Sequence, residues 1–377
     1  MTHPPQDVIV IGGGVHGAAS ALALARSGKR TLLLEQFEFG HVRGSSHGEA
    51  RIIRHAYEEA EYVRLADLAF EAWRDLERRS GETLLEPRTH LDLAPPSHPA
   101  FQAVRAALTE CGSPFEELDA PELARRFPAL QMPEEYHALI DSGAGLLRAD
   151  VATRVLRETA AQHGAVLRDQ TPVRSIEARP GHVAVETGAG RFEARELVIA
   201  AGGWVGGLLE MLGAQWPLEV LLTQSAFYAP DPAYALHDSP IFFDHPTQVY
   251  GIPEVRGGVL KIGNRHRVPV HPDRRAFEPL PENLEVLRDW ITTHLTGVSP
   301  DPAAALTCLY TFTPDEDFII DRVGDLPNVV AISACSGHGF KFGPVIGELA
   351  AALLNGAAPQ PRFRAARFAP PLSVVGR

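Results

Sequence analysis

Residues 8–17 read VIVIGGGVHG. The apolar run before Gly12 predicts a buried parallel strand, and Gly12, Gly14 and Gly17 have the GxGxxG spacing that leads from such a strand into a helix. Gly12 allows a tight turn, Gly14 lets the backbone approach a pyrophosphate at the helix N-terminus, and Gly17 lets helix and strand pack closely. The stretch therefore predicts the phosphate-binding turn of a dinucleotide-binding α/β fold.

The next elements keep the expected order. We expect a helix from Ala18 to Ser27 that ends at Gly28, followed by the apolar strand 31–34. Glu35 closes this strand, 23 positions after the first glycine of the motif, where an acidic side chain binds the ribose hydroxyls of an adenosine. Strand, glycines, helix, strand and acid in this register favour a bound dinucleotide over a turn that binds nothing.

Length and composition limit the class of protein. With 377 residues the chain can bury a large core, and we expect two domains. Its net charge of −12 argues against a nucleic-acid-binding surface, which needs clustered Lys and Arg. Neither a signal peptide nor a membrane-spanning segment is evident, so we expect a cytoplasmic protein. Cys111, Cys308 and Cys335 lack the spacing of a metal site or a disulfide framework.

The pattern changes along the chain. Asp150 is expected to cap a helix over 151–162. Residues 216–308 contain short alternating runs that are typical of an antiparallel sheet. The last apolar strand, 329–333, leads through a glycine-rich turn into a helix from Pro344 to Leu354. Because nucleotide-binding patterns occur at both ends of the chain but not in its middle, we expect two interleaved domains.

Five segments carry a family resemblance. They are residues 12–17, 46–57, 260–263, 308–321 and 337–342. In these segments the chain resembles the monomeric sarcosine oxidases, which belong to a group of flavin amine oxidases that includes N-methyltryptophan and pipecolate oxidases. The last two segments, which contain CLYT, DFIID and GHGFKF, are specific, since neither follows from a Rossmann fold as such.

The resemblance implies that the dinucleotide is FAD. We expect an α/β fold in which a Rossmann-type FAD-binding domain is interleaved with an antiparallel-sheet substrate domain. The FAD-binding domain is assigned residues 1–85, 140–215 and 320–377, and the substrate domain residues 86–139 and 216–319. Residues expected at the cofactor are Gly12, Gly14, Gly17, Glu35, Ser45, Ser46, His47, Arg51, Cys308, Gly337, His338, Gly339 and Lys341.

Cys308 lies in a Cys-x-Tyr-Thr context. In the family, a cysteine in this context bonds covalently to the flavin ring through its sulfur, so the resemblance implies a covalent FAD. The alternative is that Cys308 is a small buried hydrophobic residue, as lone cysteines usually are. Cys335 also lies near a glycine turn, but its position at a strand end fits packing better.

Arg51 and Arg54 are three positions apart, on a helical turn or in a loop. A solvated basic pair is one interpretation. The two isoleucines between them indicate burial, however, and a buried guanidinium needs an anionic partner. Arg54 is therefore a candidate to bind two oxygens of a substrate carboxylate. The resemblance implies that Lys341 adds a second positive charge there, while Arg51 faces the flavin. The turn 336–339 and the helix behind it are expected to point backbone N–H groups at the flavin.

Lys261 lies within an apolar strand, on the face opposite Leu260 and Ile262. A solvent-facing lysine is the alternative. The resemblance implies that Lys261 reaches flavin N5 through a water molecule and speeds the reaction of reduced flavin with oxygen. A fixed cation at that place stabilises the negative charge that develops on oxygen.

Tyr250 and Tyr310 are expected at the substrate face, with core packing as the alternative. The family commonly has Lys-x-Gly-x-His, whereas IGNRHR follows Lys261 here. Either His266 is shifted by one residue or Arg265 takes its place, and an arginine there favours a bulkier or acidic substrate. The candidate catalytic residues are thus Lys261, Arg51, Arg54, Lys341, Tyr310 and His266.

The expected reaction is oxidation of a secondary amino acid, sarcosine by default, to an imine that hydrolyses to glycine and formaldehyde, with oxygen reduced to hydrogen peroxide. The protein is expected to act as a monomer on a small amino acid. Alternatives are the same chemistry on N-methyltryptophan, pipecolate, proline or a glycated amino acid, and an FAD dehydrogenase that does not use oxygen. A non-catalytic nucleotide-binding protein and an NAD enzyme are more distant alternatives.

Overall fold

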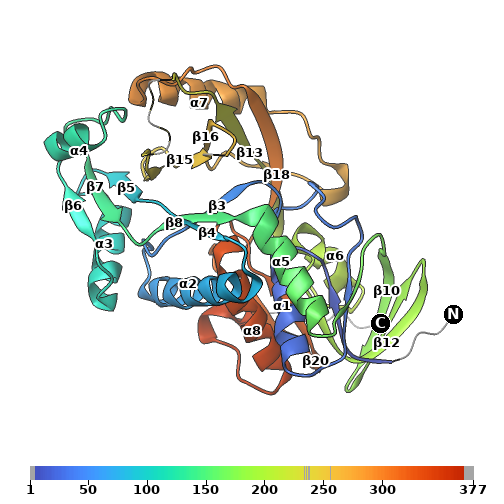
Figure 1. Ribbon diagram of the computed structural model, residues 1–377. Helices are drawn as coiled ribbons and strands as arrows, with labels where there is room; N and C mark the ends of the chain where they lie inside the picture. The colour runs from blue at the N-terminus through green and yellow to red at the C-terminus, as the bar shows by residue number, and fades with distance from the viewer. Residues whose placement is uncertain (1–4, 233, 235, 237, 255, 369–377) are drawn as a thin grey trace.

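The computed structural model describes residues 5–232, 234, 236, 238–254 and 256–368. Two large sheets form the two halves of the molecule, and a small sheet connects them (Figure 1). The helices that cover the sheets are α1 (Val15–Arg26), α2 (Ala60–Ser80), α3 (Pro99–Cys111), α4 (Ala120–Arg126), α5 (Ala149–Gln162), α6 (Val205–Glu210), α7 (Pro281–His294) and α8 (Gly343–Leu354).

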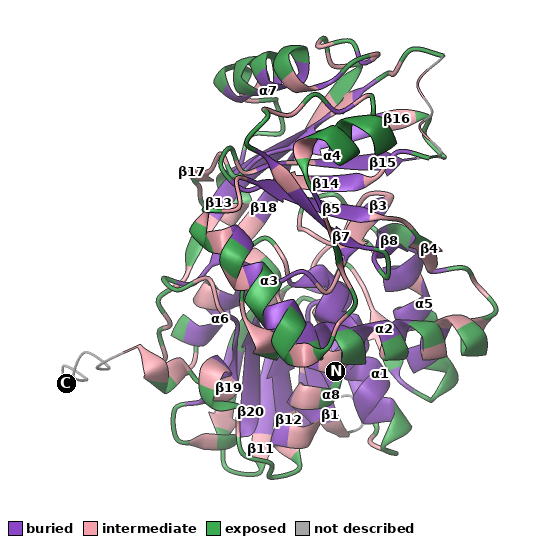
Figure 2. Cartoon of the chain, turned by 90° about the vertical axis from the view of Figure 1, so that its left-hand side faces the viewer, coloured by how far each residue is buried: buried purple, intermediate pink, exposed green. Residues whose placement is uncertain are grey.

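The first large sheet contains the predicted nucleotide-binding unit. Its parallel strands β20, β12, β1, β2 and β9 lie in this spatial order, and a β-meander continues from β12. The strands are β1 (Gln6–Ile11), β2 (Thr31–Leu34), β9 (Val166–Arg168), β10 (Val173–Arg179), β11 (His182–Thr187), β12 (Gly190–Ile199), β19 (Ile319–Val323) and β20 (Leu326–Ser333). Strands β1, β2 and β20 are mostly buried, as their continuous apolar runs predict, and Figure 2 shows β20 in the colour of buried residues.

The glycine motif adopts the predicted geometry. Gly12 has φ of +109°, and a Cβ on this residue would lie 2.4 Å from the carbonyl oxygen of Ala200. A Cβ on Gly17 would lie 1.8 Å from the carbonyl oxygen of Gly12. Helix α1 begins at Val15, three residues earlier than expected, because the distant Ser46 hydroxyl accepts a hydrogen bond (3.0 Å) from the Val15 N–H. The close approach of the backbone at Gly12 and Gly17 therefore requires glycine at both positions.

The second large sheet is mostly antiparallel. Its strands are β5 (His90–Ala94), β6 (Glu116–Leu118), β7 (His137–Asp141), β13 (Glu219–Tyr228), β14 (Ile241–Asp244), β15 (Val249–Glu254), β16 (Val259–Gly263), β17 (Val268–Pro269) and β18 (Ala304–Phe312). Leu260 and Ile262 of β16 pack in an apolar cluster with Leu287 and Trp290 of α7. Alternate residues of the same strands, including Lys261, point to the opposite face.

The small sheet contains β3 (Ala50–Ile53), β8 (Gly145–Arg148) and β4 (Leu85–Pro87). Arg51 therefore lies on a strand, so the expectation of a helical turn or loop was wrong for this residue, whereas Arg54 directly follows the strand and lies outside any helix or strand. Asp150 lies in the first turn of α5 rather than capping it, because that helix begins at Ala149, two residues earlier than expected.

Strands of the first large sheet come from residues 6–34, 166–199 and 319–333, and those of the second from 90–141 and 219–312. The assigned domain boundaries remain a prediction, and their outer ends, 1–4 and 369–377, lie outside the described residues. Among the described residues, no helix combines the length and apolar character needed to cross a membrane.

Candidate active site

A cavity of about 950 Å³ extends from the carboxyl ends of the parallel strands to the second large sheet. The volume is at the upper end of the range of about 300–1,000 Å³ that is typical of ligand pockets. Each expected site residue lines this cavity except Gly17, which packs beneath the turn, and His266. The fold thus brings together residues from both ends and the middle of the chain.

Glu35 lies at the nucleotide end of the cavity. Its carboxylate accepts hydrogen bonds from the N–H groups of Gly13 (2.7 Å) and Phe37 (2.9 Å). Burial opposes ionisation of Glu35, but His41 and these N–H groups hold its pKa below the usual value. An ionised acid therefore lies beside the glycine turn, as ribose binding requires.

Arg51 organises the loop that precedes β3. Its guanidinium donates hydrogen bonds to the carbonyl oxygens of Ser45 (2.9 Å), His47 (2.7 Å) and Ala50 (2.8 Å). The Ser45 hydroxyl in turn donates to the carbonyl oxygen of Leu309 on β18. Burial and the nearby cations lower the pKa of His47 to about 3, so His47 is neutral. The loop is thereby held against the cavity as a fixed wall.

Cys308 lies on β18, directly opposite Thr223 of β13. Its side chain is buried, and Sγ lies 3.6 Å from the carbonyl oxygen of Gly44. Cys335 lines the same cavity, and burial raises the pKa of its thiol. The geometry brings both sulfur atoms to the cavity wall.

Lys261 is buried and lines the cavity, so the solvent-facing alternative was wrong. Burial and the nearby Arg51 lower the pKa of Lys261 to about 8. Its ammonium lies 5.9 Å from the ring centre of Phe227. Its acidic neighbour is Glu254, which is not among the site residues predicted from the sequence, with 3.8 Å between Lys261 Nζ and Glu254 Oε1.

Arg54 has an anionic partner within the protein. Its Nη1 donates a hydrogen bond of 2.7 Å to Asp92 Oδ1, and the Asp92 side chain is fully buried. His245 contacts the same oxygen at 2.9 Å, and His90 lies next to both charges. Burial opposes the charge on Arg54, but Asp92 raises the pKa of the guanidinium. Part of the Arg54 fork is therefore occupied by Asp92, which is not among the site residues predicted from the sequence.

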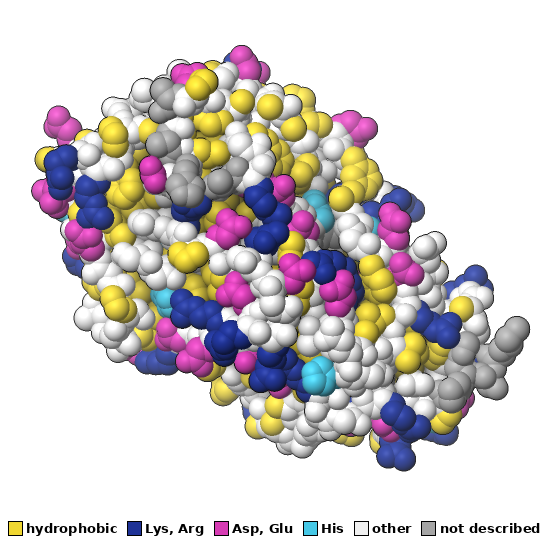
Figure 3. Space-filling model, viewed as in Figure 1, with side chains coloured by type: hydrophobic (Ala, Val, Ile, Leu, Met, Phe, Trp, Pro, Cys, Tyr) yellow, Lys and Arg dark blue, Asp and Glu magenta, His cyan; other side chains and the backbone are white. Residues whose placement is uncertain are grey.

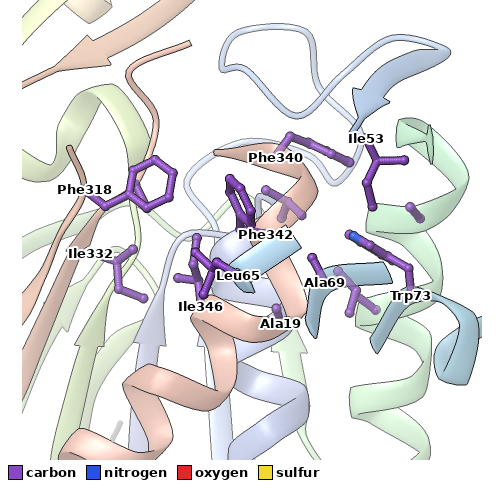
Figure 4. Close-up of a cluster of buried hydrophobic side chains, with 14 of the residues drawn as sticks. Ala19, Ile53, Leu65, Ala69, Trp73, Phe318, Ile332, Phe340, Phe342 and Ile346 are labelled. Atoms are coloured by element: carbon purple, nitrogen blue, oxygen red, sulfur yellow. The ribbon is translucent and has the colours of Figure 1, made fainter. Parts of the chain in front are cut away.

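Lys341 is held by the core beneath it. Its neighbours Phe340 and Phe342 point into the cluster of buried side chains drawn in Figure 4. Trp73 in this cluster donates a hydrogen bond of 2.6 Å to the carbonyl oxygen of Lys341. The ammonium donates to the hydroxyl of Tyr57 (2.7 Å) and to a backbone carbonyl. Burial and the nearby Arg54 hold the pKa of Lys341 well below its usual range.

Tyr250 and Tyr310 line the cavity from neighbouring parts of the sheet. The hydroxyls of Tyr250 and Ser225 lie 2.9 Å apart. The Tyr250 ring crosses over Gly263, where a Cβ would lie 2.5 Å from the tyrosine hydroxyl oxygen. Burial raises the pKa of both tyrosines, so their hydroxyls stay protonated.

The structure corrects two expectations. His266 does not line the cavity: its N–H donates to Asn264, and its ring lies 3.9 Å from Glu282. Arg265 lines the cavity instead and pairs with Glu316 at 3.1 Å.

The second correction concerns the turn 336–339. The N–H groups of Ser336, His338 and Gly339 donate to the carbonyl oxygens of Thr311 and Cys335, so they are not directed at a ligand. The turn closes on its own carbonyl groups, since Gly337 has φ of +79° and a Cβ on Gly339 would lie 1.7 Å from the Ala334 carbonyl oxygen.

Comparisons with known proteins agree with this geometry. The model of the family described as FAD dependent oxidoreductase matches residues 7–353. The peroxisomal sarcosine oxidase of Homo sapiens is 34% identical over 91% of this chain and 90% of its own length. The monomeric sarcosine oxidase of Arthrobacter sp. (strain TE1826) is 35% identical over the same shares. The chain therefore belongs to the FAD-dependent oxidoreductases.

A solved structure supports the same fold. NikD, an amino acid oxidase essential for nikkomycin biosynthesis, superposes with a TM-score of 0.85 at 27% identity, covering 95% of this chain and 96% of its own. The residues of the cavity fit FAD, since the glycine turn, the ionised Glu35 and the buried cations match the charge and shape of a dinucleotide.

On the face drawn in Figure 3, acidic and basic side chains are interspersed.

Proposed function

We propose that the protein oxidises the C–N bond of a secondary, N-methyl amino acid, with sarcosine as the default substrate and oxygen as the electron acceptor. The observation that carries the proposal is the placement of Arg54 and Lys341 in the same cavity as Lys261. The sarcosine oxidases that match over nine tenths of the chain support the substrate class. We also propose a monomer, as in the Arthrobacter relative.

Arg54 and Lys341 bind the substrate carboxylate. Asp92 uses one nitrogen of Arg54, and the rest of the fork remains for the substrate. Lys341 adds a donor held by Tyr57. FAD, when bound, accepts the two electrons that leave the substrate. Fixing the carboxylate holds the N-methyl group in one orientation, and such positioning supplies a large part of the rate enhancement.

Lys261 serves the second half of the reaction, in which oxygen is reduced to hydrogen peroxide. With a pKa of about 8, its side chain is mostly an ammonium at neutral pH. A buried cation stabilises negative charge that develops on oxygen more strongly than an exposed one does. Lys261→Met should therefore slow the oxygen reaction at least tenfold and leave substrate-driven reduction of the flavin little changed. A variant with an unchanged oxygen reaction would remove this role, whereas a slow oxygen reaction already in the wild type would favour the dehydrogenase alternative.

Cys308 is proposed as the covalent attachment point of FAD. It lies buried on the cavity wall. After acid precipitation, the wild-type polypeptide should retain yellow flavin, whereas Cys308→Ser should release it. Cys335→Ser is the matched control, since its sulfur lines the same cavity. Flavin released from the wild type would contradict the attachment, and release from Cys335→Ser alone would move it to Cys335.

The substrate is tested by measuring oxygen consumption, peroxide and formaldehyde with sarcosine, N-methyltryptophan, L-pipecolate, L-proline and a glycated amino acid. Sarcosine should give peroxide and formaldehyde in equal amounts. Arg265 on the cavity wall is the observation that favours the second candidate, a bulkier or acidic N-substituted amino acid. Oxygen consumption with one of the other amines but not with sarcosine would establish that candidate.

A further inference from the structure

Glu254 is a buried carboxylate next to Lys261. Its side chain is 5% exposed, and Oε1 has no hydrogen-bond partner among the described residues. This same oxygen lies 3.8 Å from Lys261 Nζ, beyond hydrogen-bond distance but close enough for a strong electrostatic interaction. A buried charge is costly unless an opposite charge compensates it, so the two side chains depend on each other.

The register of two paired strands sets this contact. Lys261 of β16 lies directly opposite Ile252 of β15. Glu254 is two positions further along β15, so its side chain points to the same face as Ile252 and Lys261. All three residues line the cavity. Because hydrogen-bonded strands hold both Cα positions, the distance between the charges depends on sheet pairing rather than on a flexible loop.

Other charged and titratable groups face Lys261 from the surrounding elements. Arg51 of β3 acts against the protonation of Lys261. Glu254 of β15 favours it, and Cys308 of β18 does so only while its thiol is free rather than bonded to the flavin. Lys261 lies close enough to His47 to lower the pKa of the imidazole, and Glu49 lies close to Glu254. Of these groups, Glu254 is the carboxylate that forms an ion pair with Lys261.

We propose that Glu254 is a positioning residue that keeps Lys261 protonated at the oxygen-reducing site. The inference rests on the oxidase function proposed above. Lys261 can stabilise charge on oxygen only as an ammonium, and both burial and Arg51 favour the neutral amine. Glu254 thereby sets the upper pH limit of the oxygen reaction without touching the substrate carboxylate, which Arg54 and Lys341 bind.

Glu254→Gln removes the carboxylate charge and leaves burial and Arg51 unopposed. The pKa of Lys261 should then fall from about 8 by at least about one unit. Its protonated fraction would decrease about fivefold at pH 8 and nearly tenfold at pH 9. The oxygen reaction should lose the same factors, whereas the rate at pH 6 should stay close to wild type because the lysine is protonated there in both proteins.

The experiment mixes substrate-reduced holoenzyme with oxygenated buffer between pH 6 and pH 10 and follows return of the oxidised flavin absorbance. Glu254→Asp, which keeps the charge, should restore most of the alkaline rate. Glu196→Gln is the matched control. Glu196 forms an ion pair with Lys29, with 2.6 Å between Oε2 and Nζ, and neither residue lines the cavity. A second measurement reads Lys261 directly, as the pH dependence of its trace acetylation followed by peptide mass spectrometry.

The results separate the inference from the function on which it rests. Slow reaction of the reduced wild-type enzyme with oxygen at every pH would contradict the oxidase function itself. The role of Glu254 would be overturned if the wild type reacts fast with oxygen but Glu254→Gln has the same pH profile. It would also be overturned if Glu254→Gln lowers the oxygen reaction rate by the same factor at every pH. If Glu254→Gln does not fold, the acetylation profile of Glu254→Asp decides. The shorter Asp side chain places its carboxylate farther from Lys261, so the pKa of Lys261 should fall slightly, and an unchanged pKa would overturn the role of Glu254.

Discussion

Asp92→Asn tests how the protein holds the substrate-facing Arg54. The change keeps the size of the side chain and one acceptor oxygen, but it removes the charge that lies 2.7 Å from Arg54 Nη1. Asp92 is fully buried, and the Arg54 side chain is 18% exposed. Removing one partner of a buried ion pair costs about 3–5 kcal/mol. Because the amide oxygen can still accept from Nη1, we expect the lower end, about 3 kcal/mol, and a decrease in unfolding temperature of roughly 4 °C.

Asp92→Asn should lower the stability of the fold but strengthen the binding of a carboxylate ligand. Asp92 repels any carboxylate that binds to the free side of the Arg54 guanidinium. At a separation of about 6 Å and an effective dielectric constant of about 20, two unit charges interact by roughly 2–3 kcal/mol. Some of this gain is lost because the guanidinium is less well oriented. We therefore expect the variant to bind a simple carboxylate such as acetate about tenfold more tightly.

The assay combines thermal unfolding with acetate titration followed by flavin absorbance. Asp301→Asn is the control, because Asp301 forms a surface ion pair with Arg288 at 2.6 Å, and its side chain is 72% exposed. This variant should change stability by less than about 0.5 kcal/mol. An Asp92→Asn variant as stable as the wild type would refute the buried ion pair, and weaker acetate binding would show that orientation outweighs charge.

Two further substitutions test the supports of the site. Gly263→Ala places a Cβ 2.5 Å from the Tyr250 hydroxyl oxygen, so it should cost about 1–3 kcal/mol and raise KM; Gly206→Ala, with no atom within 4 Å of the new Cβ, should do neither. Trp73→Phe removes the buried hydrogen bond to the Lys341 carbonyl, so the unfolding free energy should fall by about 1–3 kcal/mol and KM should rise. Unchanged thermal unfolding or unchanged KM in either variant would contradict the role given to the contact that the substitution alters.

Local sequence patterns predicted much of the fold because they depend on near neighbours. The GxGxxG motif identified its turn, and alternation placed Lys261 on the face opposite Leu260. The start of α1 was missed by three residues, since the Ser46 hydroxyl that binds its N-terminus is distant in sequence. Local patterns thus failed where a tertiary contact decides the boundary.

The acidic residues of the site were missed for the same reason. Asp92 is on β5 and Arg54 follows β3, so their contact depends on how two different sheets meet. A signal was present: Asp92 interrupts the apolar strand residues Leu91 and Leu93, and a charge on such a strand needs a buried partner. Glu254 could be placed beside Lys261 only once the register of β15 and β16 was known.

The proposed oxidation is tested most directly by mixing the yellow protein with sarcosine in the absence of oxygen and then admitting air. The account predicts that the oxidised flavin absorbance disappears and that air restores it with release of hydrogen peroxide. Flavin that neither sarcosine nor the other N-substituted amino acids bleach would contradict the proposed function. Flavin that is bleached but not restored by air would contradict oxygen as the acceptor.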